Sequence, residues 1–310
     1  MEIIGNHHPF LLNKETAATI GFFDGVHAGH RFLLEQLKMQ ADAHRLPSMA
    51  ITFSQYPQSI LNPGFQPELL SALDERLERL SLSKIDYCLL LDFTPSLAQL
   101  SAKEFIQDVL KREWLVKLLL IGYDHRFGKN RKEGFEDYVE YGNDCGIEIL
   151  QASELPRIPS ISSTLIRNCL LDKNVKEANR MLSYCYCLEG IVVEGNRLGR
   201  EIGFPTANIE VIDKNKIIPG DGIYASRVYW KHKKYEGMTY IGKRPTVTSH
   251  GERRIEVHLF HFSGDLYGET LQLEFVEFLR EDQSFGSMED LQKQLFADKE
   301  AAMMALAGKV

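Results

Sequence analysis

A turn rich in glycine and histidine lies near the start of the chain, in the run Gly21–His30, which reads GFFDGVHAGH. Glycines let the backbone approach a ligand closely, and a helix N-terminus offers free N–H groups with the positive end of a dipole. His27 and His30 can donate to negative charge that develops in a reaction. The run therefore predicts a phosphate-binding turn. Two alternatives stay open: the histidines merely cap or pack, or they bind zinc, for which no clear third ligand stands nearby.

Two later segments could serve the same phosphates. Residues 159–167, PSISSTLIR, are typical of a loop that enters a helix, with hydroxyls at the helix start and Arg167 about one turn in, able to reach a phosphate. Alone, such a run is usually only a helix cap. Residues 122–128, GYDHRFG, follow an apolar run and precede Lys129, Arg131 and Gly134. Taken alone, this charged run would be a solvated loop.

The second half of the chain holds a different glycine-rich stretch, residues 195–209, which read GNRLGREIGFPTANI. Glycines beside strands can cradle phosphates, and Thr206 with Asn208 places two hard oxygen donors one residue apart. The pattern predicts a site for Mg²⁺ held with ATP. The alternative is a corner turn of a barrel, which glycine and proline suit equally well.

The elements that must position these residues follow two different sequence patterns. From Ala18 to Leu150, short apolar runs alternate with amphipathic stretches, which favours a doubly wound α/β fold with a parallel sheet. In such a fold we expect the active site at the carboxyl ends of the strands. Ser101 and Glu104 form a predicted capping box. The strands expected are Thr19–Phe23, Ser48–Phe53, Asp86–Asp92, Lys117–Gly122 and Glu148–Gln151, and the helices include His30–His44, Ala72–Leu82 and Ala102–Trp114.

After about Leu182 the runs become short, alternating and rich in aromatic or β-branched residues, with Gly, Asn, Asp and Pro between them. This pattern predicts a small antiparallel barrel or sandwich, followed by a final helix from near Ser287 toward Ala307. We expect two domains, 1–182 and 183–310. The strands expected in the second are Cys187–Glu194, Gly222–Trp230, Tyr235–Ile241, Arg254–Phe262 and Thr270–Phe278.

Bulk properties narrow the function classes. The 310 residues carry a net charge of −7 and neither half is basic, which disfavours a nucleic-acid partner. No export signal or apolar run of about 18 residues occurs, so we expect a cytoplasmic protein with no membrane partner. The five cysteines lack a zinc-type pairing and are interpreted as reduced thiols.

Together, the motifs FDGVHxGH, GxDxRFG and ISSTxIR resemble the adenylyltransferase domain of prokaryotic bifunctional riboflavin kinase/FMN adenylyltransferase, also called FAD synthetase. The second half resembles the riboflavin kinase module through PTAN and through residues 241–246, 255–259, 264–268 and 278–281. The resemblance covers almost the whole chain from Ala18. It implies a Rossmann-like nucleotidyltransferase domain followed by an antiparallel β-barrel with a C-terminal helix, and the small molecules riboflavin, FMN, FAD and ATP as ligands.

The resemblance also implies roles for single residues. Glu256 would be the general base for the ribityl hydroxyl, and Thr206 with Asn208 would bind Mg²⁺ and ATP. In the first domain His27, His30 and Arg167 would act on the ATP phosphates. Flavin contacts would come from Asp124, Arg126, Phe127 and Arg280. The other expected ATP-binding residues are Gly21, Phe23, Asp24, Gly25, Gly29, Ser162, Ser163, Thr164, Gly195 and Gly199.

Four positions depart from the family pattern. Phe22 stands where asparagine is frequent, Tyr56 where histidine is usual, His125 where phenylalanine is usual, and His261 where aspartate is usual. Three of them fall in the adenylyltransferase half. We therefore keep two alternatives: a chain in which only the kinase is active, and a flavin sensor without turnover. An intact Thr206, Asn208 and Glu256 argues against the sensor, since binding alone requires no base.

Overall fold

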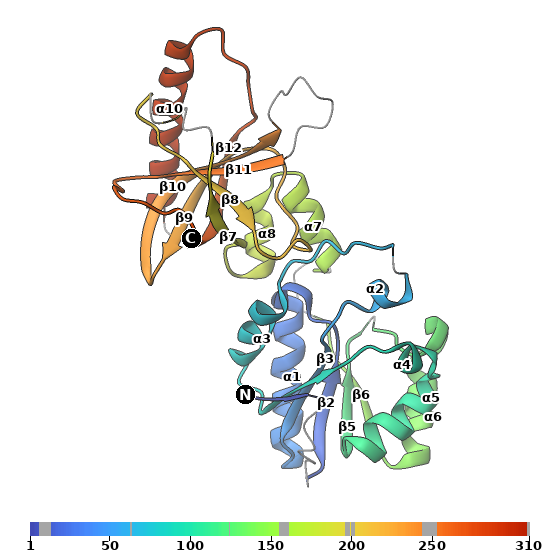
Figure 1. The fold of residues 1–310 in the computed structure, drawn as a ribbon. Helices are drawn as coiled ribbons and strands as arrows, with labels where there is room; N and C mark the ends of the chain where they lie inside the picture. Colours follow the sequence, from blue (N-terminus) through green and yellow to red (C-terminus); the bar gives the residue numbers. More distant parts are fainter. Residues whose placement is uncertain are drawn as a thin grey trace. The chain divides into compact units, whose positions relative to one another are not determined.

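A computed structural model describes residues 1–5, 14–62, 64–123, 125–154, 161–195, 199, 202–243 and 253–308 (Figure 1). The chain forms two compact units, Met1–Ser162 and Ser163–Val310. The first is a parallel α/β layer structure and the second a closed antiparallel barrel, so the predicted order of fold classes is confirmed.

A six-stranded parallel sheet forms the centre of the first unit, in the order β1-β4-β3-β2-β5-β6. Every residue of β2 and β3 is buried, as strands covered on both faces require. The five predicted strands are present within a few residues of their expected bounds, whereas the short edge strand β1 was not predicted. The strands are β1 Glu2–Gly5, β2 Thr16–Ile20, β3 Ser48–Phe53, β4 Tyr87–Leu91, β5 Val116–Ile121 and β6 Glu148–Gln151.

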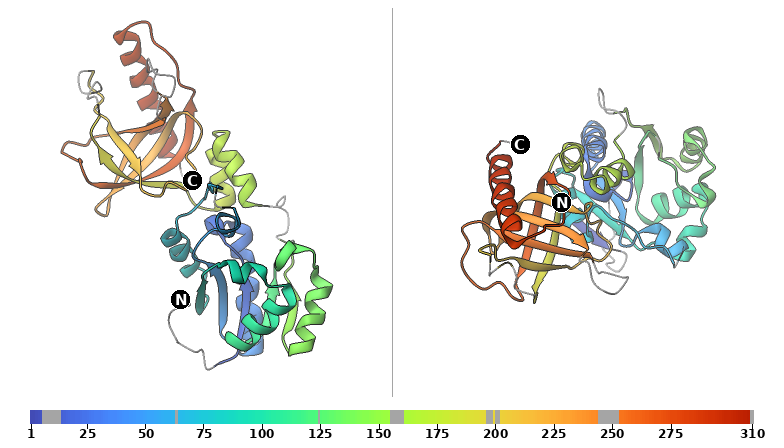
Figure 2. Two further views of the ribbon diagram at one scale, coloured as in Figure 1. Left: turned by 45° about the vertical axis from the view of Figure 1, so that its right-hand side comes forward. Right: turned by 90° about the horizontal axis from the view of Figure 1, so that it is seen from above.

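Helices cover both faces of this sheet (Figures 1 and 2). Leu34 and Leu37 of α1 pack on one face with Leu80 of α3, while Ile106 and Leu110 pack on the other. The predicted capping box is present, since the Ser101 hydroxyl accepts the Glu104 N–H at 3.2 Å. The elements are η1 Asp24–Val26, α1 Ala28–His44, α2 Pro57–Leu61, α3 Leu73–Ser81, α4 Pro95–Gln99, α5 Ala102–Glu104, the π-helical η2 Phe105–Glu113, η3 Lys129–Arg131 and α6 Phe135–Cys145.

The second unit is a six-stranded barrel closed in the order β10-β11-β8-β7-β12-β9, which decides between the predicted barrel and sandwich. Strand β8 was not predicted, and the final helix begins after an N-cap at Ser287 as expected. The elements are α7 Ser163–Leu171, α8 Val175–Leu182, β7 Cys187–Val193, β8 Ala207–Val211, β9 Gly222–Trp230, β10 Lys233–Lys243, β11 Arg253–Leu259, β12 Thr270–Arg280 and α10 Met288–Ala307.

Helices α7 and α8 pack against the barrel. The Asn179 amide donates to the Phe275 carbonyl at 2.8 Å and accepts the Tyr186 N–H at 2.7 Å. The Gly220 N–H donates to the Leu170 carbonyl at 2.9 Å. The compact units therefore divide before α7, earlier in the chain than the domain boundary of 182/183, which stays a prediction.

Candidate active sites

The glycine-histidine turn joins the carboxyl end of β2 to the start of α1, and its backbone is strained. Phe23, Gly25 and Val26 all have positive φ, at 56°, 72° and 40°. Glycine adopts such angles freely, whereas a β-branched valine does so only when its surroundings force it. Strain of this kind is often found at functional sites. The turn must therefore be held in place by contacts from outside it.

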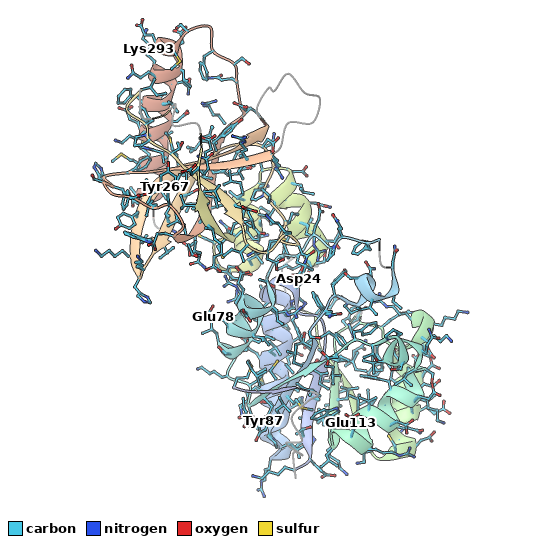
Figure 3. The ribbon with its side chains drawn as sticks, viewed as in Figure 1. Asp24, Glu78, Tyr87, Glu113, Tyr267 and Lys293 are labelled. Carbon is cyan, nitrogen blue, oxygen red and sulfur yellow. The ribbon has the colours of Figure 1, made fainter. Side chains whose placement is uncertain are left out.

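Leu70 and Ser71 provide those contacts by bonding to Asp24 and Gly25 of the turn, and Figure 3 labels Asp24. The Asp24 carboxylate is 3% exposed and accepts the N–H groups of Leu70 at 2.9 Å and Ser71 at 3.1 Å. The Gly25 N–H donates to the Ser71 hydroxyl at 2.9 Å. We call Asp24, Gly25, Leu70 and Ser71 the latch. It gives Asp24 a structural task, while the predicted ATP contact of this carboxylate stays a prediction.

Two further predicted residues of the turn have packing roles. The Phe23 ring is 1% exposed, and Gly21 faces it so closely that an added Cβ would lie 3.1 Å from the ring. An ATP contact by Phe23 would therefore come from its backbone. Gly29 faces His27, and an added Cβ there would lie 3.7 Å from the Ile161 carbonyl, which brings the start of the ISSTxIR segment to the turn.

His27 and His30 form a stacked pair. Their ring centroids lie 3.6 Å apart with an angle of 17° between the planes. The His30 backbone N–H donates to His27 Nδ1 at 3.3 Å, so a neutral His27 carries its proton on Nε2. Burial lowers the pKa of His30 well below its ordinary value, and His27 and His125 lower it further. His30 is therefore neutral at pH 7.

The other predicted residues of the first site are dispersed between core, surface and helix. Arg126 is exposed. The Phe127 ring is buried and stacks on the Tyr138 ring, with the centroids 4.3 Å apart and an angle of 12° between the planes, so the structure shows Phe127 in a packing role. Asp124 lies outside the described residues. Ser162 ends the first unit, and α7 of the second unit carries Ser163, Thr164 and Arg167. The roles of all these residues stay predictions.

One residue near this site was missed from the sequence: Arg76 of α3, which is 2% exposed. Its guanidinium lies 4.1 Å from the Phe22 ring centroid and donates to the Phe53 carbonyl, the last of β3, at 2.5 Å. Burial lowers the pKa of Arg76 to about 10 against the opposing effect of Asp24, so the group stays charged. A sequence signal existed, because Arg76 shares the apolar helix face of Leu73, Leu77 and Leu80.

The second site is built by strand pairing in the barrel. Register places Asn208 of β8 directly opposite Glu256 of β11. The Thr206 hydroxyl donates to the Glu256 carboxylate at 3.1 Å. Thr206 and Glu256 are 50 positions apart in sequence. The fold therefore brings together the three residues that the resemblance selected.

Two predicted glycines make room for this cluster. A Cβ on Gly195 would lie 1.9 Å from Asn208 Nδ2, and one on Gly199 would lie 2.2 Å from the Phe204 carbonyl. Such distances cannot occur between real atoms, so only glycine fits at these two positions beside Asn208 and Phe204. This use differs from a phosphate cradle, although both can coexist in one loop.

Negative charge gathers beside Glu256. Tyr240 lies opposite Glu256 in the β10–β11 register, and its hydroxyl donates to Asp282 at 2.8 Å. Burial raises the pKa of Tyr240, and so do the hydrogen bond to Asp282 and the charges of Asp282 and Glu256. Hard oxygen donors with nearby carboxylates are the donor set that a small divalent cation prefers.

Arg280, predicted to contact flavin, forms a two-pronged ion pair with Asp298 of α10, at 2.8 Å and 2.7 Å. Asp298 is 3% exposed and the Arg280 side chain 19% exposed. The shown role of Arg280 is therefore to anchor the final helix to the end of β12. Its flavin contact stays a prediction.

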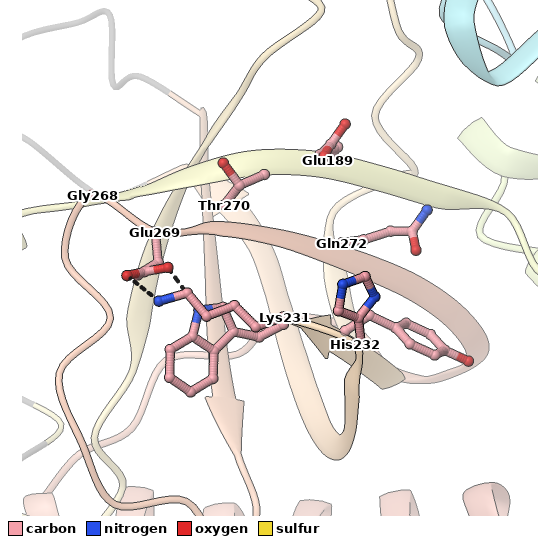
Figure 4. A pocket seen from close by; sticks show the side chains of 9 residues that line it. Glu189, Lys231, His232, Gly268, Glu269, Thr270 and Gln272 are labelled. Carbon is pink, nitrogen blue, oxygen red and sulfur yellow. Dashed lines mark hydrogen bonds and ion pairs between the residues drawn. The ribbon is translucent and has the colours of Figure 1, made fainter.

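Two hollows lie away from these clusters. One, of about 590 Å³, is lined by the hairpin between β9 and β10, by β7 and by the start of β12, and Trp230 and Lys231 there donate to Glu269 at 2.9 Å and 2.8 Å (Figure 4). It lies at the opposite end of β9 from Ile223, the residue that pairs with Tyr240. The other, of about 620 Å³, lies along α1, where Gln36 accepts the Ser153 N–H at 2.9 Å. Neither hollow is lined by the predicted site residues.

Known proteins resemble the chain along nearly its whole length. The family model described as FAD synthetase matches residues 11–165, and the one described as riboflavin kinase matches residues 182–306. The bifunctional riboflavin kinase/FMN adenylyltransferase of Escherichia coli K12 is 36% identical over 91% of this chain and 90% of its own. The protein of the same description from Haemophilus influenzae is 34% identical over 97% and 98%.

A solved structure is also similar. A crystal structure described as the macrolide-efflux protein of Streptococcus pneumoniae has a TM-score of 0.86 and 33% identity, and the match covers 98% of this chain and 99% of that one. Its description names a transport function, whereas the curated relatives are described as enzymes. Within the described residues of the present chain, no helix is long and apolar enough to cross a membrane.

Proposed function

This chain belongs to the family of bifunctional riboflavin kinase/FMN adenylyltransferases, and we propose that the two clusters described above carry out its two reactions. The enzyme phosphorylates riboflavin to FMN and adenylylates FMN to FAD, with ATP as the donor in both steps. Thr206, Asn208 and Glu256 serve the first step. His27 and His30, with the ISSTxIR segment, serve the second.

In the kinase step, Glu256 accepts the proton of the ribityl hydroxyl. The hydroxyl oxygen bonds to the γ-phosphorus of ATP, the bond from that phosphorus to the bridging oxygen breaks, and ADP leaves. A positioned carboxylate base typically contributes 10²–10⁴-fold to such a step. The Thr206 hydroxyl, which donates to Glu256, orients the carboxylate. This contact, together with the register of Asn208 opposite Glu256, is the observation that supports the proposal most strongly.

Mg²⁺ fits this cluster. The Thr206 hydroxyl and the Asn208 carbonyl are hard oxygen donors, and Glu256 and Asp282 add negative charge nearby. When bound, the ion would offset charge on the transferring phosphoryl group. Gly195 keeps the space that the Asn208 side chain requires. We assign Thr206 and Asn208 as the residues that hold it together with ATP.

In the adenylyl step no protein nucleophile is required, because an FMN phosphate oxygen attacks the α-phosphorus of ATP and pyrophosphate leaves. The protein aligns the reactants and stabilises charge. The Nε2–H of His27 and the N-terminal amides of α1 can donate to the phosphates. The family resemblance assigns Ser162, Ser163, Thr164 and Arg167 to the same ATP phosphates.

Two substitutions in the full-length protein test the assignment. We expect Glu256→Gln to lower FMN formation at least a hundredfold, since the base is lost, while added FMN still becomes FAD. His27→Ala should do the reverse. The flavins are separated by chromatography after incubation with ATP and Mg²⁺. Loss of both activities in both folded variants would refute the two-cluster assignment.

A further inference from the structure

A buried histidine stands two residues beyond Glu256 on β11. His258 is 8% exposed, and its Nδ1 lies 2.7 Å from the Pro205 carbonyl oxygen. Because a carbonyl can only accept, Nδ1 carries the proton and donates. Side chains two apart on a strand point to the same face, so His258 and Glu256 project from β11 on one side.

Pro205 directly precedes Thr206, the residue whose hydroxyl donates to Glu256. The loop is therefore fixed to β11 at two adjacent points: the Pro205 carbonyl to His258, and the Thr206 hydroxyl to Glu256. Strand β8 begins one residue later, at Ala207, where pairing with Val257 starts. His258 thus fixes the loop directly before the ladder begins.

Packing holds the His258 ring in this position. Phe204 lies 5.1 Å from the ring centroid at 56°, and Phe260 lies 5.7 Å away at 61°. Phe204 is itself covered by Phe296 of α10 at 5.0 Å. A ring packed against two aromatic side chains has little freedom to turn its Nδ1 away from Pro205.

We propose that His258 is a positioning residue of the kinase reaction: its N–H holds the Pro205 carbonyl and thereby sets Thr206 beside Glu256 for ATP. The proposal rests on the assignment of Thr206 and Glu256 made above. Burial lowers the pKa of His258 and Lys299 lowers it further, while the hydrogen bond to Pro205 raises it. The contact requires the Nδ1–H, which the neutral ring protonated at Nδ1 and the imidazolium both carry.

Two variants at this position separate the hydrogen bond from packing. His258→Leu fills the space without a donor, whereas His258→Asn places an amide N–H where Nδ1 stands. We expect the leucine variant to raise the KM for ATP in riboflavin phosphorylation about tenfold, the cost of one lost hydrogen bond, and the asparagine variant to restore it to within about threefold of the original. The KM for riboflavin should change less.

The chain offers two controls. Phe260→Leu disturbs the same aromatic packing without touching the Pro205 contact, and its KM for ATP should stay within about threefold of the original value. Adenylylation of added FMN by each variant checks that the first unit is intact. A thermal unfolding curve checks the second unit.

The outcomes distinguish two failures. If His258→Leu is folded and keeps the original KM for ATP, or if His258→Asn and Phe260→Leu raise it equally, the positioning role is wrong. If instead Glu256→Gln phosphorylates riboflavin normally, the cluster assignment itself is wrong. An inactive Glu256→Gln variant together with an unchanged His258→Leu variant would overturn only the present inference.

Discussion

The two sites differ in what holds them. In the barrel, Asn208 and Glu256 face each other because two strands pair in a fixed register, and Thr206 lies one residue before that pairing. In the α/β unit, His27 and His30 stand on a turn with positive φ at three positions, and in the latch Leu70 and Ser71 hold Asp24 and Gly25 of this turn from outside.

Both reactions transfer a phosphorus group from ATP. The difference shows that two kinds of structural support can serve such similar chemistry. A β-ladder fixes the backbone that carries the site residues through a series of backbone hydrogen bonds. A strained turn depends on a few contacts at its edge. The two activities should therefore respond to different kinds of substitution, and each is the internal control for the other.

The largest effect is expected from filling the space that the barrel site requires. In Gly195→Ala the new Cβ would lie 1.9 Å from Asn208 Nδ2, so the amide must move. A displacement near 1 Å in a catalytic cluster can cost about a hundredfold, and we expect that loss in riboflavin phosphorylation. Steady-state rates of FMN formation measure it, with FMN adenylylation unchanged. Gly286→Ala, where no atom lies within 4 Å of the new Cβ, is the control.

A smaller effect is expected from weakening the latch. Ser71→Ala removes the hydroxyl that accepts the buried Gly25 N–H at 2.9 Å. We expect adenylylation of FMN to fall about tenfold, in line with the loss of one buried hydrogen bond, while riboflavin phosphorylation stays the same. Ser81 is exposed at the end of α3, the helix that follows Ser71, and Ser81→Ala should change neither rate. A latch variant that lost both activities equally would remove the contrast drawn here.

The smallest effect concerns acid sensitivity. The pKa of His30 lies well below its ordinary value of 6.5 because of burial, His27 and His125. As the pH falls below 6.5, the unfolded chain binds a proton that folded His30 does not, so the stability of the first unit declines by up to about 1.4 kcal/mol per pH unit. His258 adds a dependence of the same sign in the barrel unit, where its pKa is also lowered by burial.

Urea unfolding at pH 7 and pH 5 checks this dependence. Fluorescence of Trp114 in a Trp230→Phe background reports on the first unit alone, since each unit holds one tryptophan. His30→Gln should reduce the pH dependence, because it removes the group whose pKa burial lowers. Equal pH dependence in the original protein and in His30→Gln would contradict the prediction.

Sequence pattern predicted the barrel unit well where strands were long, and less well at its shortest strand. Gly222–Trp230 was predicted to the residue, because the turn residues Pro219–Asp221 precede a run that is rich in aromatic and aliphatic side chains. Strand β8, Ala207–Val211, was missed because it overlaps the PTAN motif, begins two residues after a proline and holds only five residues. The juxtaposition of Asn208 and Glu256 could not come from pattern alone, since register depends on long-range pairing.

In the α/β unit the strands and the capping box were predictable, but the supports of the active turn were not. Asp24 belonged to a recognisable motif, whereas its partner Ser71 lies 47 residues away in a loop without periodicity. The packing of Phe127 on Tyr138 and the ion pair of Arg280 with Asp298 could not be predicted either, because an aromatic or an arginine in a motif can contact a ligand, its own core or both. Arg76 could have been noticed as a charge on an apolar helix face.

Mixing the two inactive variants tests most directly the central claim, that each reaction has its own cluster on this chain. Purified Glu256→Gln and His27→Ala proteins are incubated separately and together with riboflavin, ATP and Mg²⁺, and the flavins are separated by chromatography. Alone, the first should leave riboflavin unchanged and the second should stop at FMN; together they should produce FAD, because FMN made by one protein reaches the other. A mixture that forms no FAD, or a single variant that completes both steps, would contradict the account.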